Sequence, residues 1–193
     1  MNMPWYVIVE PCMQITQGDI IIDCPVATWK EESAIIEDGV DFGKKLEASV
    51  EFVSIDTIVM TQACDLEQDK AQYVILCPHY SIDLYKDQWE SSMRERQQEP
   101  SSKAWKSYIE DIRQGKIWNL SMLNSYEDGS QQMDIRIVDF REIFSLPRRF
   151  LENWLQSQDK RIRLLPPYRE HLSQAFARFF MRVGLPIDIQ RFK

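Results

Sequence analysis

The sequence has few of the residues that build a disulfide or metal scaffold. Its 193 residues include only four cysteines and two histidines, and no two cysteines stand in a CxxC spacing. The one group that could supply zinc ligands, Cys64, Cys77 and His79, lacks the short paired spacings of a structural zinc site. We therefore expect reduced thiols, no metal and no cofactor, and core positions for Cys12, Cys24 and Cys77.

Long apolar runs are also missing. No stretch approaches the roughly 18 to 20 consecutive apolar residues that span a bilayer, and the N-terminus lacks the basic segment and cleavage site of a signal peptide. These absences predict a cytoplasmic protein without a membrane partner. Hydrophobic residues nevertheless form 44% of the chain, enough for a sizeable core, and we expect residues 1–193 to form a single domain.

The charges are unevenly distributed along the chain. Residues 1–135 carry 11 Lys/Arg and 24 Asp/Glu, whereas residues 136–193 carry 12 and 6, so the net charge of -7 combines -13 with +6. The basic part could bind the acidic part of the same molecule, or it could form a surface for phosphate or an acidic partner. The first interpretation is favoured because it needs no partner.

The stretch from 55 to 80 holds the most distinctive local pattern. Two short apolar runs, 58–61 and 73–76, predict buried strands of a hairpin, and a polar loop at 62–72 joins them. The candidate recognition residues of this loop are Thr61, Gln62, Cys64 and Asp65.

Two interpretations of this loop stay open. In the functional one, its polar side chains meet a partner or ligand. In the structural one, they bond backbone amides of their own loop and Cys64 turns inward as a small hydrophobe. A cysteine nucleophile would need a base, but His79 lies near the far end of the predicted hairpin, and no GxSxG, HExxH or phosphate-loop motif is present. We expect no catalytic residue.

Outside this hairpin, short strands alternate with amphipathic helices. Apolar residues at helical spacing predict a helical hairpin inserted at 83–115 and a long C-terminal helix at 166–184, whose buried face holds Leu172, Phe176, Phe179, Phe180 and Val183. The same helix carries Arg178 and Arg182 on other faces, a candidate binding edge for a partner or for nucleic acid. The other predicted elements are strands at 5–9, 20–24, 50–55, 117–123, 133–140 and 161–165, a turn at 54–57, a loop at 28–46 and a helix that opens at 145–147. Pro25 is expected to end the strand at 20–24.

Two resemblances add to these patterns. The segments QGDIIIDCPV and DTIVMTQACDLEQDKAQYVILCP resemble the opening of the SH3-like barrels of PemK/MazF toxins. In those toxins RNA cleavage uses an arginine of the early loop and a Ser or Thr at a strand end; Thr61 could take the second role, whereas residues 28–46 contain no arginine.

The second resemblance spans most of the chain. The run RIRLLPPYREHLSQAFARFFMRVGLP, with TQACDL and VDFREIFSLP, is similar to a family of small bacterial proteins that brings no known activity with it. Proteins of this kind can sit beside defence or toxin genes, which implies an accessory role in a bacterial system.

The sequence therefore predicts an α+β fold, with a bent, mainly antiparallel sheet or SH3-like (PemK-like) barrel, the inserted helical hairpin and the C-terminal helix. The leading functional prediction is a non-enzymatic protein-interaction or accessory module of a bacterial defence or regulatory assembly, CRISPR-associated or toxin-like, whose partner is another protein of that system. The alternatives are a PemK/MazF-like endoribonuclease and a nucleic-acid-binding adaptor that uses the C-terminal arginines.

Overall fold

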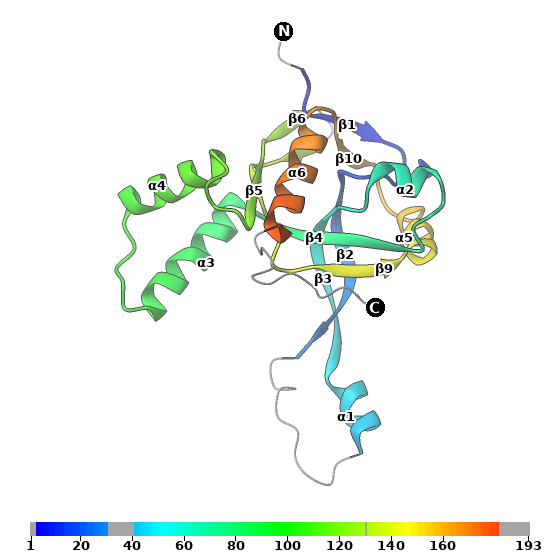
Figure 1. Ribbon diagram of the computed structural model, residues 1–193, viewed down its shortest axis with the longest axis horizontal. Helices are drawn as coiled ribbons and strands as arrows, with labels where there is room; N and C mark the ends of the chain where they lie inside the picture. Colours follow the sequence, from blue (N-terminus) through cyan, green and yellow to red (C-terminus); the bar gives the residue numbers. More distant parts are fainter. Residues whose placement is uncertain (1–2, 31–40, 130, 182–193) are drawn as a thin grey trace, which may run out of the picture.

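An antiparallel sheet with helices on both of its faces forms the centre of the molecule (Figure 1). The computed structural model describes residues 3–30, 41–129 and 131–181. The elements in chain order are β1 (Tyr6–Val9), β2 (Asp19–Trp29), α1 (Phe42–Ala48), β3 (Val50–Val59), α2 (Ala63–Glu67), β4 (Tyr73–Ser81), α3 (Ile82–Glu95), α4 (Ser102–Arg113), β5 (Leu120–Leu123), β6 (Tyr126–Asp128), β7 (Gln131–Met133), β8 (Arg136–Asp139), β9 (Phe144–Pro147), α5 (Arg148–Leu155), β10 (Arg161–Leu164) and α6 (Tyr168–Phe180).

The strand order is β1-β10-β2-β3-β4-β8-β5, and β9 also pairs with β4. β8 pairs with β4 at residues 79–81 and β9 pairs with it at 73–76, so the two follow one another along β4. The predicted α+β class with a mainly antiparallel sheet is confirmed. The sheet is not closed into a barrel: among the described strands, β1 and β5 are the two ends of the order. Near these ends, the Tyr6 hydroxyl donates a hydrogen bond to the Asn124 carbonyl (2.7 Å), which is a side-chain contact and not a ladder.

The longest ladder joins β2 and β3, and it corrects three predictions. β2 does not stop at Pro25, residues 54–57 are not a turn, and part of the predicted loop at 28–46 belongs to β2 and α1, while 31–40 lies outside the described residues. The register shifts between Ile21 and Cys24, where Asp23 adopts a φ of 52°. Proline lacks the backbone N–H that a neighbouring strand would bond. Pro25 is tolerated because β10 pairs with β2 only near the start of β2, so the outer edge of β2 has no partner strand at Pro25.

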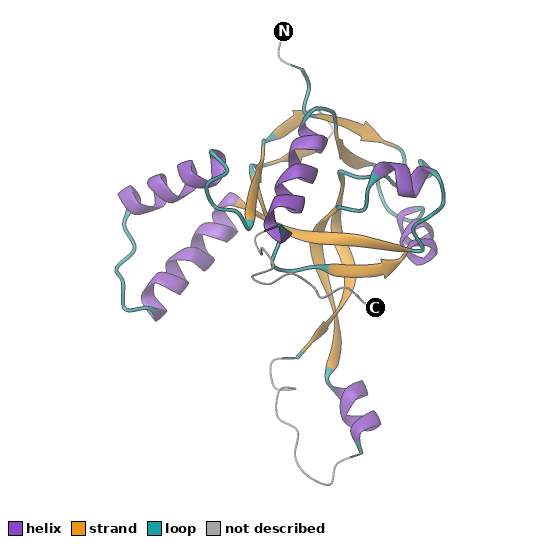
Figure 2. Cartoon of the chain, viewed as in Figure 1, coloured by secondary structure: helices purple, strands orange, loops and turns teal. Residues whose placement is uncertain are grey.

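Beyond the rest of the sheet, these two strands continue as a two-stranded ribbon that ends at α1 (Figure 2). We call residues 24–29 and 50–55 the β2–β3 arm. In the described sheet they pair only with each other, since β10 reaches β2 at 19–20 and β4 reaches β3 at 57–59.

The C-terminal helix α6 covers one face of the sheet (Figure 1). Its Leu172 is buried in a cluster with residues of β1, β2, β3, β8 and β10, and Phe176 meets Phe140 edge-on at a centroid distance of 5.5 Å. The predicted apolar face is therefore correct at these positions, because residues four apart share a helix face. Phe180, also expected on that face, is 56% exposed, and Val183 lies outside the described residues.

The opposite face is covered by α2 and α5, which bury Leu66, Leu151 and Leu155 against β2, β4 and β9. The helix predicted to open at 145–147 begins later, because Phe144–Pro147 pairs with β4 as strand β9 and only Arg148 starts α5. The predicted strands at 117–123 and 133–140 are shorter than expected, and the second is divided between β7 and β8.

The two helices expected between 83 and 115 are α3 and α4, which lie at one side of the sheet (Figure 1). The hydroxyl of Ser101 caps α4 by accepting a hydrogen bond from the Ala104 amide (3.2 Å), as its position before the helix predicts. Tyr85 of α3 and Ile112 of α4 pack against β5 and β8 in a third apolar cluster.

Candidate functional site

The predicted recognition residues at 61–65 lie together, but part of the predicted loop at 62–72 is helical: Thr61 and Gln62 precede the short helix α2, whereas Cys64 and Asp65 lie within it. Thr61 is buried, and its hydroxyl accepts a hydrogen bond from the Ile75 amide of β4 (2.7 Å). This bond joins the two ends of the β3–β4 connection. Thr61 therefore holds the turn against the sheet. The structural interpretation expected its hydroxyl to bond a backbone amide of its own loop instead.

Cys64 is exposed on α2, which contradicts the structural interpretation, in which it turns inward. Leu66, which is fully buried, supplies the apolar anchor of α2 instead. The Cys64 thiol lies near two acceptors, Gln62 Oε1 at 3.7 Å and Asp65 Oδ1 at 3.9 Å. Neither group is a base strong enough to make a thiolate at neutral pH.

The other cysteines divide between surface and core. Cys12 is exposed, although a core position was expected for it, whereas Cys24 and Cys77 are buried as expected. Burial raises the pKa of the Cys24 thiol to about 11 and that of Cys77 to about 12. Both buried thiols stay protonated and act as small hydrophobes.

The nearest histidine in the sequence, His79, is sealed inside the sheet. It pairs with Val138 across β4 and β8 and is 1% exposed. Burial is the main cause that lowers its pKa to about 4, and the positive charge of Arg136 contributes to the lowering, while Asp56 and the Thr57 backbone act in the opposite sense. Among the described residues, no hydrogen bond of good geometry reaches either ring nitrogen.

His79 is also remote from Cys64 along the hairpin. The β3–β4 ladder pairs Val59 with Leu76 at the end nearest the turn, and His79 lies three residues further along β4, as the sequence predicts for a hairpin. In the described part of the chain, no three His, Cys, Asp or Glu side chains form a group that could hold a metal ion.

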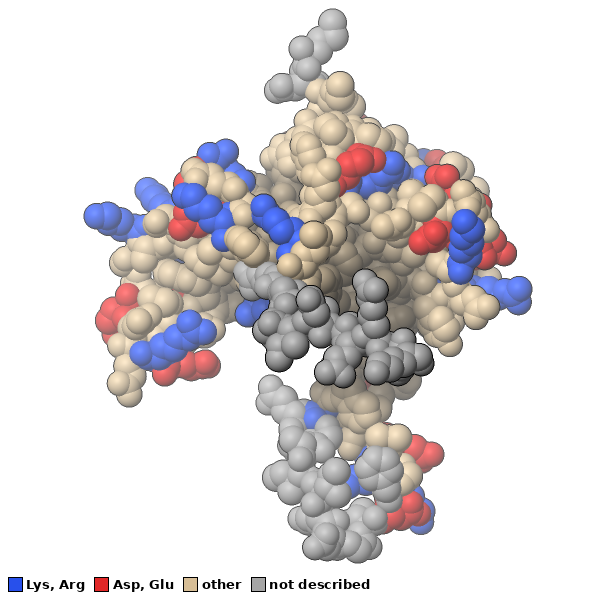
Figure 3. Space-filling model, viewed as in Figure 1, with Lys and Arg blue, Asp and Glu red and all other residues tan. Residues whose placement is uncertain are grey.

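The arginines of the C-terminal part bind carboxylates of the same molecule. Asp19, fully buried at the start of β2, receives Arg161 (Nε–Oδ2 2.8 Å) and Arg163 (Nη2–Oδ2 3.0 Å). Further ion pairs of this kind are Lys160–Glu10, Arg136–Asp56, Arg148–Asp69 and Arg141–Asp139. Figure 3 accordingly shows basic and acidic side chains interspersed on the face it presents. The favoured interpretation of the charge asymmetry, an intramolecular one, accounts for these contacts.

Arg178, one of the two arginines expected to form a binding edge, also has an internal role. It donates a hydrogen bond to the Gly115 carbonyl (2.9 Å), and its guanidinium lies 5.7 Å from the centroid of the Trp118 ring. These contacts tie α6 to the segment between α4 and β5. Arg182 lies outside the described residues.

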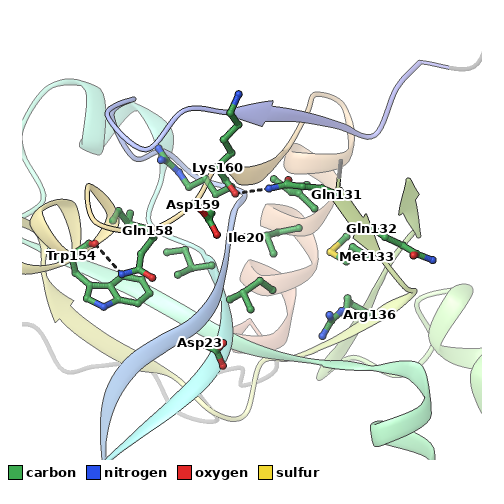
Figure 4. Close-up of a pocket in the computed structure, with 15 residues that line it drawn as sticks. Ile20, Asp23, Gln131, Gln132, Met133, Arg136, Trp154, Gln158, Asp159 and Lys160 are labelled. Carbon is green, nitrogen blue, oxygen red and sulfur yellow. Dashed lines mark hydrogen bonds between the residues drawn. The ribbon is translucent and has the colours of Figure 1, made fainter. Parts of the chain in front are cut away.

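Two features of the surface have no counterpart among the residues singled out from the sequence. The first is the β2–β3 arm, which carries Trp29 at 62% and Phe52 at 83% exposure. The second is a cavity of about 470 Å³ beside β2, bounded by α5 and β7 (Figure 4). The arm depends on where β2 goes after Asp23, so a sequence reading that ends this strand at Pro25 misses it, whereas the cavity depends on which distant segments meet β2 at residues 20–23.

No match to the chain was found among protein-family models, curated proteins or solved structures. In the described ranges, no helix is both long enough and apolar enough to cross a bilayer. The functional argument therefore rests on the geometry of the chain itself.

Proposed function

We propose that the protein is a non-enzymatic interaction module, an accessory subunit that binds another protein through its β2–β3 arm. One observation carries the proposal: two large aromatic side chains, Trp29 and Phe52, are exposed on the same face of a ribbon that leaves the sheet.

The register of the ribbon puts these side chains together. Ala27 pairs with Phe52 and Trp29 pairs with Val50, so all four side chains are on one face, since paired residues share a face and positions two apart return to it. A two-stranded ribbon is at best marginally stable alone in water, and clustered aromatic exposure marks surfaces that become buried in a complex. A partner that covers this face would stabilise the arm as well as gain contact area.

The charge of the chain favours a basic, apolar segment of another protein over a second copy. Two copies would each bring a net charge of -7 to the contact, and like net charge opposes self-association. Glu51 is exposed on the face of the arm opposite Phe52, because neighbouring residues of a strand point to opposite faces, and Glu47 is exposed on the nearby α1. A partner strand that pairs along the edge of the arm and alternates apolar residues with Lys or Arg would put the apolar residues on the aromatic face and the basic residues on the Glu51 face.

The proposal can be tested by selecting displayed random peptides on the purified protein. We expect the enriched peptides to combine apolar and basic residues. Phe52→Thr keeps a residue that favours strands while it removes the ring, and loss of a buried aromatic anchor of about 2 kcal/mol should weaken their binding by about thirtyfold. Tyr73→Thr is the matched control, because Tyr73 is an exposed strand aromatic (60%) on β4, away from the arm.

Three results would overturn the proposal. Enriched peptides that bind both variants equally would show that the arm is not the contact surface. A dimer in sedimentation that Phe52→Thr dissociates would make the occupant a second copy. Turnover of RNA that is lost in Thr61→Val would favour the PemK/MazF-like endoribonuclease instead.

A further inference from the structure

Each strand of the β2–β3 arm has an outer edge that no other described strand covers (Figure 2). The backbone N–H and C=O groups along such an edge can pair with a strand of another chain. In an antiparallel ladder, only every second residue of a strand directs these groups outward. The value of each edge to a partner therefore depends on which residues of the arm point their backbone groups away from the neighbouring strand.

A hydrogen bond at the end of the arm determines this pattern. The Lys30 amide donates to the Ser49 carbonyl (2.9 Å), and the next pair of the ladder is Trp29 with Val50. Hydrogen-bonded and non-hydrogen-bonded pairs alternate along the ladder, so the backbone groups of Trp29 and Val50 point away from one another. The same holds at every second pair toward the sheet, which are Ala27–Phe52 and Pro25–Ser54.

A hydrogen bond at the other end of β3 agrees with this pattern. The Met60 amide donates to the Ile75 carbonyl of β4 (2.8 Å), so the backbone groups of Met60 face away from β2. The extra residue of the bulge belongs to β2, and β3 keeps its alternation through it. The N–H groups of Val50, Phe52 and Ser54 therefore point out of the arm on the side where β4 joins β3.

The two edges of the arm differ in how they are protected. Natural edge strands are often blocked by proline and by bulges. The outer edge of β2 has both, since Pro25 has no N–H and Asp23 adopts a φ of 52° at the bulge. Residues 50–55 of β3 contain neither a proline nor a bulge. The edge of β3 is therefore the one open to a partner strand.

We propose that the partner binds as an extended segment that adds an antiparallel strand to the outer edge of β3. This inference rests on the proposed function and specifies how the arm holds its partner. The ladders of the described sheets are antiparallel, and antiparallel pairing is the more stable kind per residue. A third strand also stabilises the arm, because a ribbon of two strands is marginal alone in water.

The side chains of β3 select the sequence of the added strand. A residue opposite Phe52 lies on the aromatic face, because residues opposite one another share a face, and an apolar side chain packs there. A residue opposite Glu51 lies on the other face, where Lys or Arg pairs with the carboxylate. Backbone hydrogen bonds supply affinity in this mode of binding, and the alternating side chains supply specificity. The segment thus alternates apolar and basic residues.

The test uses an end-capped peptide of about seven residues in which lysine and valine alternate, titrated into the whole chain by calorimetry. Because the backbone of Phe52 points outward, the valine opposite it directs its N–H toward β3, whereas the N–H of the next lysine points to solvent. N-methylation of the central valine should therefore weaken binding by about fivefold or more, and N-methylation of the lysine beside it by less than about twofold. The two methylated peptides have the same composition, so each controls for the other.

Protein variants test the same contact from the side of the arm. Ser54→Pro removes an outward N–H of β3, and it should bind the unmethylated peptide about fivefold more weakly than Ser54→Ala, which keeps this N–H. Ala27→Pro removes an outward N–H of β2 instead. Weaker binding to Ala27→Pro than to Ser54→Pro would place the added strand on β2 and overturn the inference. Thermal melting shows whether each variant is folded, and the methylated peptides test the pairing on the unaltered protein.

Four further results would overturn strand addition. They are no saturation by the peptide at about 1 mM, equal binding of all three peptides, weaker binding only when lysine is methylated, which indicates parallel pairing, and a dimer in sedimentation that Ser54→Pro dissociates, which makes the occupant a second copy. If Phe52→Thr weakens binding while both methylated peptides bind normally, the proposed function stands and only this inference fails. If Phe52→Thr has no effect on any bound peptide, both fail.

Discussion

Acidification should weaken the fold through His79, whose imidazole is held neutral inside the sheet. In the unfolded chain this group titrates near its ordinary pKa of 6.5, whereas burial lowers the pKa in the folded protein to about 4. Between these values the unfolded chain binds one more proton than the folded protein, so the free energy of unfolding falls as the pH falls. Above about pH 7 neither state binds the proton and the effect vanishes.

The size of the effect follows from the two pKa values. On going from about pH 7.5 to about pH 5, the difference in proton binding lowers the free energy of unfolding by about 2 kcal/mol. Urea denaturation at several pH values in this range measures it. The range ends at about pH 5 because aspartates and glutamates begin to titrate below it.

Two variants isolate the contribution of His79 to the pH dependence of the free energy of unfolding. His79→Leu removes the titrating group from its buried site in β4, and it should abolish most of this pH dependence. His171→Asn should leave it unchanged, because His171 is exposed on α6. If His79→Leu keeps the full pH dependence, or if the NMR signals of the His79 ring titrate near pH 6.5, the reasoning about its burial is wrong.

Two further substitutions test the structural roles assigned above. Asp19→Ala should lower the free energy of unfolding by about 3 to 5 kcal/mol in urea, because it leaves the guanidinium groups of Arg161 and Arg163 without their carboxylate; a loss below about 1 kcal/mol would contradict this. Thr61→Val should cost about 1 kcal/mol and speed hydrogen exchange at the Ile75 amide, because that part-buried donor loses its acceptor. Unchanged exchange at Ile75 would show that the bond does not matter.

The helices could be predicted from the sequence because their signals are local. Apolar residues at helical spacing indicate α3, α4 and α6, and a serine before α4 is enough to predict its cap. α6 begins at Tyr168, close to the predicted position 166, and its predicted end at 184 lies outside the described residues.

The strands were harder to predict because their limits depend on distant partners. Pro25 and the polar residues Ser54, Asp56 and Thr57 are local signals for a break. Pairing along both β2 and β3 overrides these signals, since eight register pairs hold the two strands together across the bulge. Strand β9 shows the same effect: Pro147 favours the start of a helix, but the ladder with β4 continues to that residue.

The candidate functional residues, like the helices and strands, differ in how far the sequence predicts their positions. Thr61, Gln62, Cys64 and Asp65 are neighbours in the sequence and so remain neighbours in the fold, although only the structure shows that Thr61 is an internal anchor and Cys64 is exposed. The cavity draws its lining from β2, β7, α5 and β10. These segments are far apart in the chain, and no local pattern of residue types indicates that they meet.

The pairing of β1 with β10 sets an order of events during synthesis. β1 (Tyr6–Val9) pairs with β10 (Arg161–Leu164), and the ion-pair partners of Asp19 are also residues of β10. A nascent chain that has not yet reached Arg161 thus exposes an unpaired apolar strand and an unpaired carboxylate. Contacts across such long sequence separations slow folding, and unpaired strand edges promote aggregation in incomplete chains. Expression of fragments that end before β10 should therefore yield insoluble material, even though most of the sheet is already encoded.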